Sequence, residues 1–483
     1  MVESLADFRP SACNFRFQHS EFQLLKSPSH RWLCCQIGAR EHYAVARALH
    51  EQGLLTGLVT DWYAYGGKNG DQRAEVSGQR PVSQTSEIRL LPSVIRRLSS
   101  VIRHPSARAA RAEGIPDELV HSIPFRSLLW KWRVRRLAAQ GRLFEAYAQT
   151  DAAFAVAVSR LALPLHEVFF GYSYASLEIL EVEKKRGVLT VLDQIDSGAV
   201  ESRLVAEEMK RHPEIAGPAP EFPATNFDRN RREWELADII VVNSEWSRDA
   251  IIAEGADPAK IEILPLAYEV GDGGQMAEDR EQKAAAGSLP SDLRPPSSAL
   301  RVLWLGQVNV RKGIHYLMQA ARLLERENVH FDVVGPIGIL PTAIASAPRN
   351  LTFHGPVGRD RATEWYRQSD VFVLPTLSDG FALTQLEAFA HGLPVIVTPN
   401  CGRVVEDGKT GFIIPPSDPS ALADVILRFV RNPDLAREMA PACRAAVKAY
   451  SVESLGERLV AIVERHKTSR RLPSAVSSLI SVS

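Results

Sequence analysis

The sequence predicts an α/β protein with two domains, each built on a doubly wound parallel β-sheet. Short apolar runs alternate with runs of helical periodicity, and several of the apolar runs end at a glycine. The alternation occurs in two series, at 30–270 and 300–467, which a turn-rich linker or exposed loop at 271–299 separates. Strands that alternate with helices form parallel sheets covered on both faces, so each series predicts one domain.

The first series predicts an N-terminal domain. We expect strands at 32–37, 54–60, 167–170, 188–192, 238–243 and 261–264, and helices at 39–50, 176–185 and 245–254. Gly38 and Gly171 are expected to end the strands that precede them. Residues 1–29 lack periodicity and are expected to form a tail. A basic insert at about 66–150 interrupts the pattern.

The second series predicts a C-terminal domain. Its expected strands are 301–305, 330–334, 351–353, 371–374, 394–397 and 411–414. A helix is expected at 313–327, a second from Ala382 or Leu383 to Gly392, and closing helices at 419–431, 435–450 and 455–467. Residues 468–483 are expected to be a disordered tail.

Composition limits the function. Lys plus Arg and Asp plus Glu number 57 each, so net charge gives no case for nucleic-acid binding. The five cysteines form no CxxC pair, which predicts neither a disulfide framework nor a zinc site. No apolar signal segment and no run of about 18 uncharged apolar residues is present. We therefore expect a cytoplasmic protein, with peripheral contact at the inner membrane face left open.

The most informative segment surrounds Asp379 and Glu387, which have seven residues between them. The segment predicts a buried strand, a loop with Gly380 and then a helix. Free N–H groups at a helix start bind phosphate, so those of Phe381, Ala382, Leu383 and Thr384 are expected to face a cleft. Taken alone, Asp379 could instead cap the helix and Glu387 could be a solvated helix residue.

This segment resembles the acid-x7-Glu motif of retaining glycosyltransferases of family 4 (glycosyl transferases group 1). The resemblance implies the GT-B fold, in which two Rossmann-like domains face each other across a cleft, with the last helix returning to the first domain. It implies that Asp379 is the catalytic acid that touches the donor sugar, and that Glu387 holds the ribose of the nucleotide. The family usually has Glu where this chain has Asp379.

A second stretch, 303–317, resembles the loop with which the family neutralises the donor diphosphate. Lys312 matches the family Lys, Gln307 stands where an Arg is usual, and Arg311 is expected to replace that charge. The alternative is that Arg311 and Lys312 form an exposed turn. By the same resemblance, Gly38 lies near the phosphates and Val357 belongs to a loop that lines the nucleobase pocket.

The acceptor side is less defined. The segment Gly171–Tyr174 occupies the place where many members carry a histidine, so Tyr172, Asp193 and Asp196 are the candidates there. Either Asp could equally cap a helix. The resemblance implies that the departing phosphate assists the acceptor. The family usually needs no metal, and no DxD motif has a convincing context, so no cofactor and metal independence are expected.

The basic stretch at 94–143 contains eleven Arg or Lys and three acids. Trp130 and Trp132 beside its cations could form an interfacial helix, which suggests a lipid-linked or anionic acceptor. The alternative is a solvated helix whose tryptophans pack inward. Two residues that are two apart do not share a helical face.

Three functions follow from these patterns. The leading hypothesis is a retaining transfer of sugar from a UDP- or GDP-sugar to a hydroxyl acceptor, saccharide or lipid-linked, in polysaccharide or glycolipid synthesis. A second is another reaction on the same fold, such as a phosphorylase or an epimerase. A third is a catalytically silent protein that binds a sugar nucleotide within a polysaccharide assembly complex.

Overall fold

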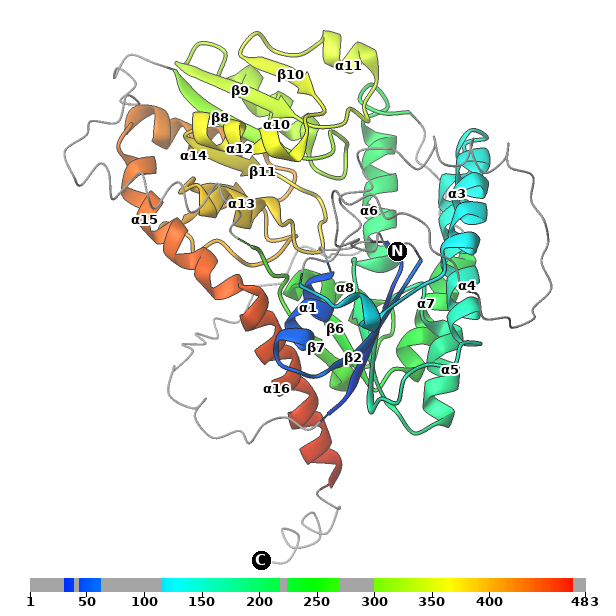
Figure 1. The fold of residues 1–483 in the computed structure, drawn as a ribbon. Coiled ribbons are helices and arrows are strands. Elements are labelled where there is room, and N and C mark those ends of the chain that lie inside the picture. Colours follow the sequence, from blue (N-terminus) through cyan, green and yellow to red (C-terminus); the bar gives the residue numbers. More distant parts are fainter. Residues whose placement is uncertain (1–29, 39–42, 62–113, 218–223, 270–298, 472–483) are drawn as a thin grey trace, which may run out of the picture.

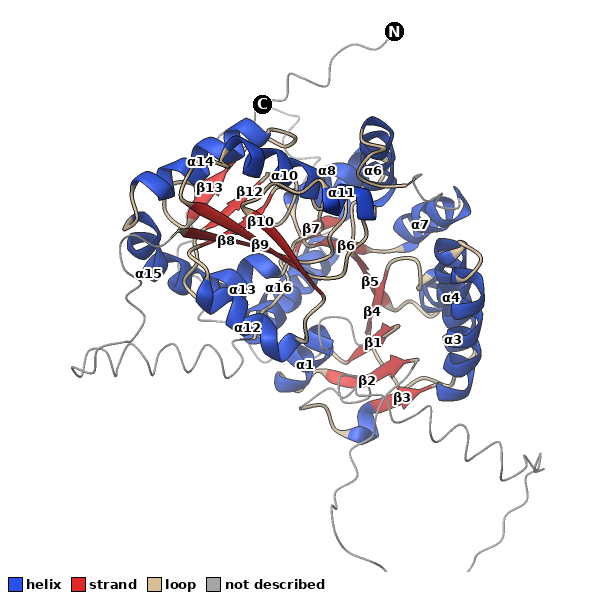
Figure 2. Cartoon of the chain, turned by 90° about the horizontal axis from the view of Figure 1, so that it is seen from above, coloured by secondary structure: helices blue, strands red, loops and turns tan. Residues whose placement is uncertain are grey.

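The computed structural model describes residues 30–38, 43–61, 114–217, 224–269 and 299–471. These residues form two parallel sheets (Figures 1 and 2). The N-terminal sheet has the order β3-β2-β1-β4-β5-β6-β7 and the C-terminal sheet the order β10-β9-β8-β11-β12-β13. In both, the strand order reverses beside the first strand of the domain, and ligands of such sheets bind beyond the carboxyl ends of the strands at that point. The predicted fold class is confirmed.

The N-terminal sheet carries helices on both faces (Figure 2). Along the first strand, Trp32 and Cys34 pack into one apolar cluster, and Leu33 and Cys35 into another. This alternation is the two-residue period of a strand buried on both sides. The strands are β1 Trp32–Gln36, β2 Leu55–Thr60, β3 Val120–Ser122, β4 Val168–Tyr172, β5 Leu189–Gln194, β6 Ile239–Val242 and β7 Ile261–Ile263. The helices are α1 Ala44–Glu51, α3 Pro124–Ala138, α4 Leu143–Val158, α5 Leu177–Lys185, α6 Gly198–Arg211, α7 Ala224–Leu236 and α8 Glu245–Ala253.

Gly171 does not end its strand, as the sequence pattern predicted, because β4 continues through it to Tyr172. A Cβ atom at Gly171 would lie 2.5 Å from Ser176 Oγ and 2.7 Å from the Phe169 ring. The glycine is therefore needed for close packing within the sheet rather than for a turn.

The C-terminal sheet has the same design. Its strands are β8 Leu300–Leu305, β9 Val329–Val334, β10 Leu351–Gly355, β11 Val371–Leu374, β12 Val395–Val397 and β13 Gly411–Ile413. Its helices are α10 Ile314–Leu323, α11 Pro341–Ala345, α12 Arg359–Gln368, α13 Thr384–Ala390, α14 Pro419–Arg431 and α15 Leu435–Val447. Short 3₁₀ turns occupy Asp117–Leu119, Pro258–Lys260 and Lys448–Tyr450.

The last helix, α16 (Val452–Arg471), leaves the C-terminal domain and packs against α1 (Figure 1). Its buried residues Leu455, Leu459, Ile462 and Val463 join the N-terminal apolar cluster. The expected tail at 468–483 begins too early, because α16 extends to Arg471.

Several expected segments lie outside the described residues. These are the tail at 1–29, most of the linker at 271–299 and the part of the basic insert before residue 114. The rest of the insert forms β3, α3 and the first half of α4, which spans the expected boundary at 150. In the described part of the chain, no helix is both long enough and apolar enough to cross a bilayer.

Candidate active site

Two loops meet at the carboxyl end of the C-terminal sheet. One joins β8 to α10 and carries Lys312, and the other joins β11 to α13 and carries Asp379. The side chains of Lys312 and Asp379 form an ion pair. The loops are also joined through the backbone, because Leu377 N donates to Arg311 O at 2.9 Å and Thr376 Oγ1 donates to the same oxygen at 3.0 Å. The structure thus brings together residues that the two motifs predicted separately.

The cations in these loops are partly shielded from water. Burial, with Arg311 as a neighbouring cation, lowers the pKa of Lys312 to about 7, against the opposing effect of Glu201. Arg311 donates to Ser378 O at 3.3 Å and lies 3.5 Å from a carboxylate oxygen of Glu201. Arg311 and Lys312 are therefore held against the site and do not form an exposed turn.

Glu387 lies in the first turn of α13, as expected. The Tyr366 hydroxyl donates to Glu387 Oε2 at 2.6 Å, which leaves Oε1 for another donor. Helix α13 begins at Thr384, slightly later than expected, because Ala382 has a left-handed backbone with φ of 63°. Within the described residues, no hydrogen bond uses the backbone N–H groups of 380–384. This geometry is consistent with the expectation that these N–H groups bind phosphate.

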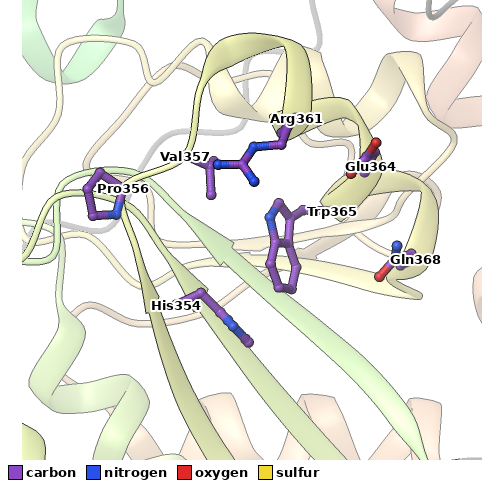
Figure 3. A pocket seen from close by; sticks show the side chains of 7 residues that line it. All are labelled: His354, Pro356, Val357, Arg361, Glu364, Trp365 and Gln368. Carbon is purple, nitrogen blue, oxygen red and sulfur yellow. The ribbon is translucent and has the colours of Figure 1, made fainter.

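Gln307 and Val357, two further residues predicted to bind the donor, are not part of the Lys312–Asp379 ion pair. Gln307 is exposed in the β8–α10 loop. Val357 lines a separate cavity of about 280 Å³ beside α12, where the His354 ring lies 4.2 Å from that of Trp365 (Figure 3). Lys312, Asp379 and Glu387 do not line that cavity.

A larger cavity of about 570 Å³ opens at the carboxyl ends of the N-terminal strands. Of the predicted residues, Gly38 and Asp196 line it. Asp196 Oδ1 accepts hydrogen bonds from the Tyr174 hydroxyl and from Gly198 N, each at 3.0 Å, so it both lines the cavity and binds the first N–H of α6. Tyr172 and Asp193 are instead buried in the sheet.

Helix α3 forms one wall of this cavity, through Trp130, Lys131, Val134 and Arg135. The Trp130 ring packs on Phe154 at 6.4 Å, whereas Trp132 is 62% exposed and lies under the Arg136 guanidinium. The two tryptophans therefore point to different sides, so neither sequence alternative describes both.

The two sites adjoin across the domain interface. Ser378, from the β11–α13 loop, donates to Glu201 of α6 at 2.8 Å and accepts from Trp246 Nε1 of α8 at 2.9 Å. Burial raises the pKa of Glu201, although Arg311 opposes this. Glu201 also lines the large N-terminal cavity. It therefore contacts both the C-terminal loops, through Arg311 and Ser378, and the cavity of the N-terminal domain.

Sequence reasoning missed Glu201, Ser378, Tyr174 and Tyr366. Tyr174 has a positive φ of 71°, and its N–H donates to buried Glu233 at 2.6 Å. Ser378 and Tyr174 lie in segments that the sequence singled out, but each of the four residues acts through a partner distant in the sequence. Their only signal is spatial.

Metal ligands are not gathered in the Lys312–Asp379 region. Among the described residues, the group with metal-like spacing is Glu208, His212 and His315. The expected metal independence of the reaction stays a prediction. Four cysteines, Cys34, Cys35, Cys401 and Cys443, are free and buried.

Comparison with known proteins bears on the fold and on the C-terminal domain. A family model described as "Glycosyl transferases group 1" matches residues 299–432. D-inositol 3-phosphate glycosyltransferase of Streptomyces scabiei is 28% identical over 257 residues, which cover 48% of this chain and 56% of that protein. The Streptomyces coelicolor enzyme of the same name is 26% identical over 262 residues, covering 49% and 57%. The chain thus spans about half the length of the curated relatives it matches.

Solved structures share the whole architecture. Anabaena HepE in complex with UDP aligns with a TM-score of 0.52 and 13% identity, covering 90% of this chain and 100% of that one. Sucrose-phosphate synthase from Thermosynechococcus elongatus aligns with a TM-score of 0.54 and 17% identity, covering 91% and 100%. Identities this low establish the fold alone. The chain has the GT-B fold, and its residues 299–432 match the glycosyl transferases group 1 family model.

Proposed function

We propose that this protein transfers a sugar from a nucleotide-sugar to a hydroxyl group of an acceptor held in the N-terminal cavity. The observation that carries the proposal is the Lys312–Asp379 ion pair one loop away from Glu387, directly across the interface from that cavity. Relatives named as glycosyltransferases support it, as does the UDP-bound structural neighbour.

In this proposal, Lys312 and Arg311 bind the donor diphosphate. A buried cation stabilises the negative charge that develops on a departing phosphate more strongly than a solvated one does. The free Oε1 of Glu387 accepts a ribose hydroxyl, while Tyr366 fixes the carboxylate. The diphosphate must displace Asp379 from Lys312, which frees Asp379 to accept hydrogen bonds from sugar hydroxyls.

The transfer breaks the bond between the anomeric carbon and the phosphate oxygen and forms a bond from that carbon to the acceptor oxygen. The acceptor proton leaves with the nucleoside diphosphate. We propose retention of configuration, a UDP- or GDP-sugar as donor, and a role in polysaccharide or glycolipid synthesis. The support for these finer statements is the motif resemblance, and NMR of the product anomer tests retention.

The test begins with thermal unfolding of the chain against UDP-, GDP- and ADP-sugars, because a ligand of the folded state raises the melting temperature. The donor that stabilises is then used to measure donor hydrolysis and transfer. Lys312→Ala and Glu387→Ala should each reduce turnover about 100-fold or more, as expected for groups that stabilise charge in the transition state. Lys409→Ala, in an exposed ion pair with Glu406, is the matched control.

Near-wild-type turnover in both site variants would contradict the proposal. Donor binding without hydrolysis or transfer would instead support a silent sugar-nucleotide-binding protein.

The outer side of α3 supports a peripheral membrane contact and a lipid-linked acceptor. Leu129 is 69% and Trp132 62% exposed, and Arg133 and Arg136 are exposed beside them. Apolar side chains among cations are typical of a helix that lies at an anionic bilayer surface. Binding to anionic but not neutral vesicles, weakened by Trp132→Ala, is expected. If the protein bound equally to anionic and neutral vesicles, a soluble saccharide acceptor would be favoured.

A further inference from the structure

The end of helix α6 lies inside the other domain. Ile215 and Ala216, which follow α6, pack into the C-terminal apolar cluster, and Ile215 O accepts a hydrogen bond from Leu340 N at 2.9 Å. Figure 1 shows α6 rising from the N-terminal domain towards the C-terminal one. The last turn of α6 therefore faces the start of α10.

Four side chains converge at this contact. Glu208 Oε1 lies 3.0 Å from His315 Nε2 and 3.3 Å from His212 Nε2, and the Tyr316 hydroxyl donates to the same oxygen. Glu208 and His212 are four residues apart, so they share one face of α6. Glu208 and His315 are almost fully buried.

A neutral His212 ring cannot donate a hydrogen bond from each of its two nitrogens to the carboxylates they face. Its Nδ1 lies 3.0 Å from Glu214 Oε1, while its Nε2 faces Glu208. A neutral imidazole has one N–H and one lone pair, so it can donate to only one of two carboxylates. The other contact opposes two lone pairs unless a proton or a metal ion lies between them.

Two imidazoles and a carboxylate are a ligand set that Zn²⁺ prefers. One ligand atom from each residue lies within 4.8 Å of the others. Zinc bonds of roughly 2.0–2.2 Å at tetrahedral angles place ligand atoms roughly 3.3–3.6 Å apart, close to the 3.0 and 3.3 Å between Glu208 Oε1 and the two histidines. Glu214 accepts the remaining ring proton of His212, as carboxylates commonly do beside zinc-bound histidines.

We propose that Glu208, His212 and His315 bind Zn²⁺ and thereby join α6 of the N-terminal domain to α10 of the C-terminal domain. His315 follows Lys312 by three residues. The ion therefore fixes the diphosphate-binding loop relative to the domain that carries the acceptor cavity, without touching the donor. This site is structural and does not make sugar transfer depend on the metal for its chemistry.

The experiment uses the full chain after chelator treatment, titrated with Zn²⁺ against a competing chelator dye. One Zn²⁺ per chain and a higher melting temperature are expected, with no response to Mg²⁺. Co²⁺ should give the visible absorption of a four-coordinate site. Both His212→Ala and His315→Ala should abolish stoichiometric binding.

Two further variants test the proposal even if substitution of a ligand prevents folding. Glu214→Gln leaves the three ligands in place and should weaken Zn²⁺ binding about 10- to 100-fold. Glu207→Gln removes an equally exposed acid, on α6 itself, and should change nothing (side-chain exposures of 63% for Glu214 and 62% for Glu207). His30→Ala should also change nothing, because His30 lies between two carboxylates as His212 does but belongs to no group of ligands with metal-like spacing among the described residues.

Substoichiometric binding to the native chain would overturn the proposal. So would a Zn²⁺ affinity that Glu214→Gln and Glu207→Gln alter equally. Either result would mean that a proton, and not a metal, lies between His212 and Glu208.

Discussion

Glu387 is oriented by a single tyrosine. Tyr366 is buried, its ring stacks on His391 at 5.1 Å, and its hydroxyl contacts Glu387 Oε2. Burial and the charge of Glu387 raise the pKa of Tyr366, so it remains a donor. Tyr366 is thus a positioning residue for the proposed ribose contact.

Tyr366→Phe should raise the donor KM roughly tenfold with little change in kcat, because a hydrogen bond to a charged group contributes about 1.5–3 kcal/mol. Steady-state kinetics with ribose and 2′-deoxyribose donors measure this. The variant should discriminate less than the wild type between ribose and 2′-deoxyribose donors. A loss confined to kcat, with the ribose preference intact, would contradict this role.

Lys312 gives a pH dependence of known sign. Its pKa of about 7 lies below the ordinary value because burial disfavours the charged form, and Arg311 adds to this. A bound diphosphate would favour the cation and raise that pKa. If Lys312 binds the diphosphate as proposed, we expect the free protein to take up a proton above pH 7 when the donor binds, and affinity should fall as pH rises.

Donor Kd measured by calorimetry from pH 6 to 9 should be constant below pH 7 and then rise by at most about tenfold per pH unit. Lys312→Arg, which stays charged, should flatten the profile. An affinity that increases above pH 7 would exclude this assignment.

At the scale of elements, close contact with the β11–α13 loop restricts which residue the β8–α10 turn can accept at position 313. Gly313 has φ of 76°, and a Cβ atom there would lie 1.8 Å from Pro375 O. Gly408 has the same φ but open space around it. Alanine variants at the two positions therefore distinguish the cost of backbone strain from the added cost of steric contact.

Gly408→Ala should therefore lower the free energy of unfolding by only about 1–2 kcal/mol, the cost of a left-handed residue with a side chain. Gly313→Ala should cost clearly more, about 3 kcal/mol or above, since the backbone of one loop must move. Denaturant unfolding of both variants checks this, and equal losses would show that the loops are not tightly packed together.

At the scale of the whole molecule, α16 makes the N-terminal domain depend on the C-terminal end of the described chain. Leu459 is buried between α16 and the N-terminal sheet, whereas Leu323 of α10 is 61% exposed. Removing buried methyl groups costs far more than removing exposed ones.

Leu459→Ala should destabilise by about 2–5 kcal/mol and Leu323→Ala by less than about 0.5 kcal/mol. Hydrogen exchange should locate the Leu459→Ala effect in β1 and α1. Faster exchange confined to the C-terminal sheet would show that α16 does not support the N-terminal domain.

Much of the fold could be predicted because it is encoded locally. Parallel strands buried on both faces are apolar throughout, and the helices between them keep their own period, so both domains are visible in the sequence. The Asp379–Glu387 and Lys312 motifs were visible for a similar reason, since each occupies one short segment. Gly171 was misread because a glycine within a buried strand and a glycine at its end look alike in sequence.

The sequence by itself determined the two α/β domains, the loop that carries Lys312 and the helix that carries Glu387. Only the tertiary structure decided that Ser378 meets Glu201, that Tyr366 holds Glu387, and that His212 and His315 approach Glu208 across the domain interface. These contacts join segments far apart in the chain. Local hydrophobic periodicity records which face of an element is buried, but not which distant side chain lies against it.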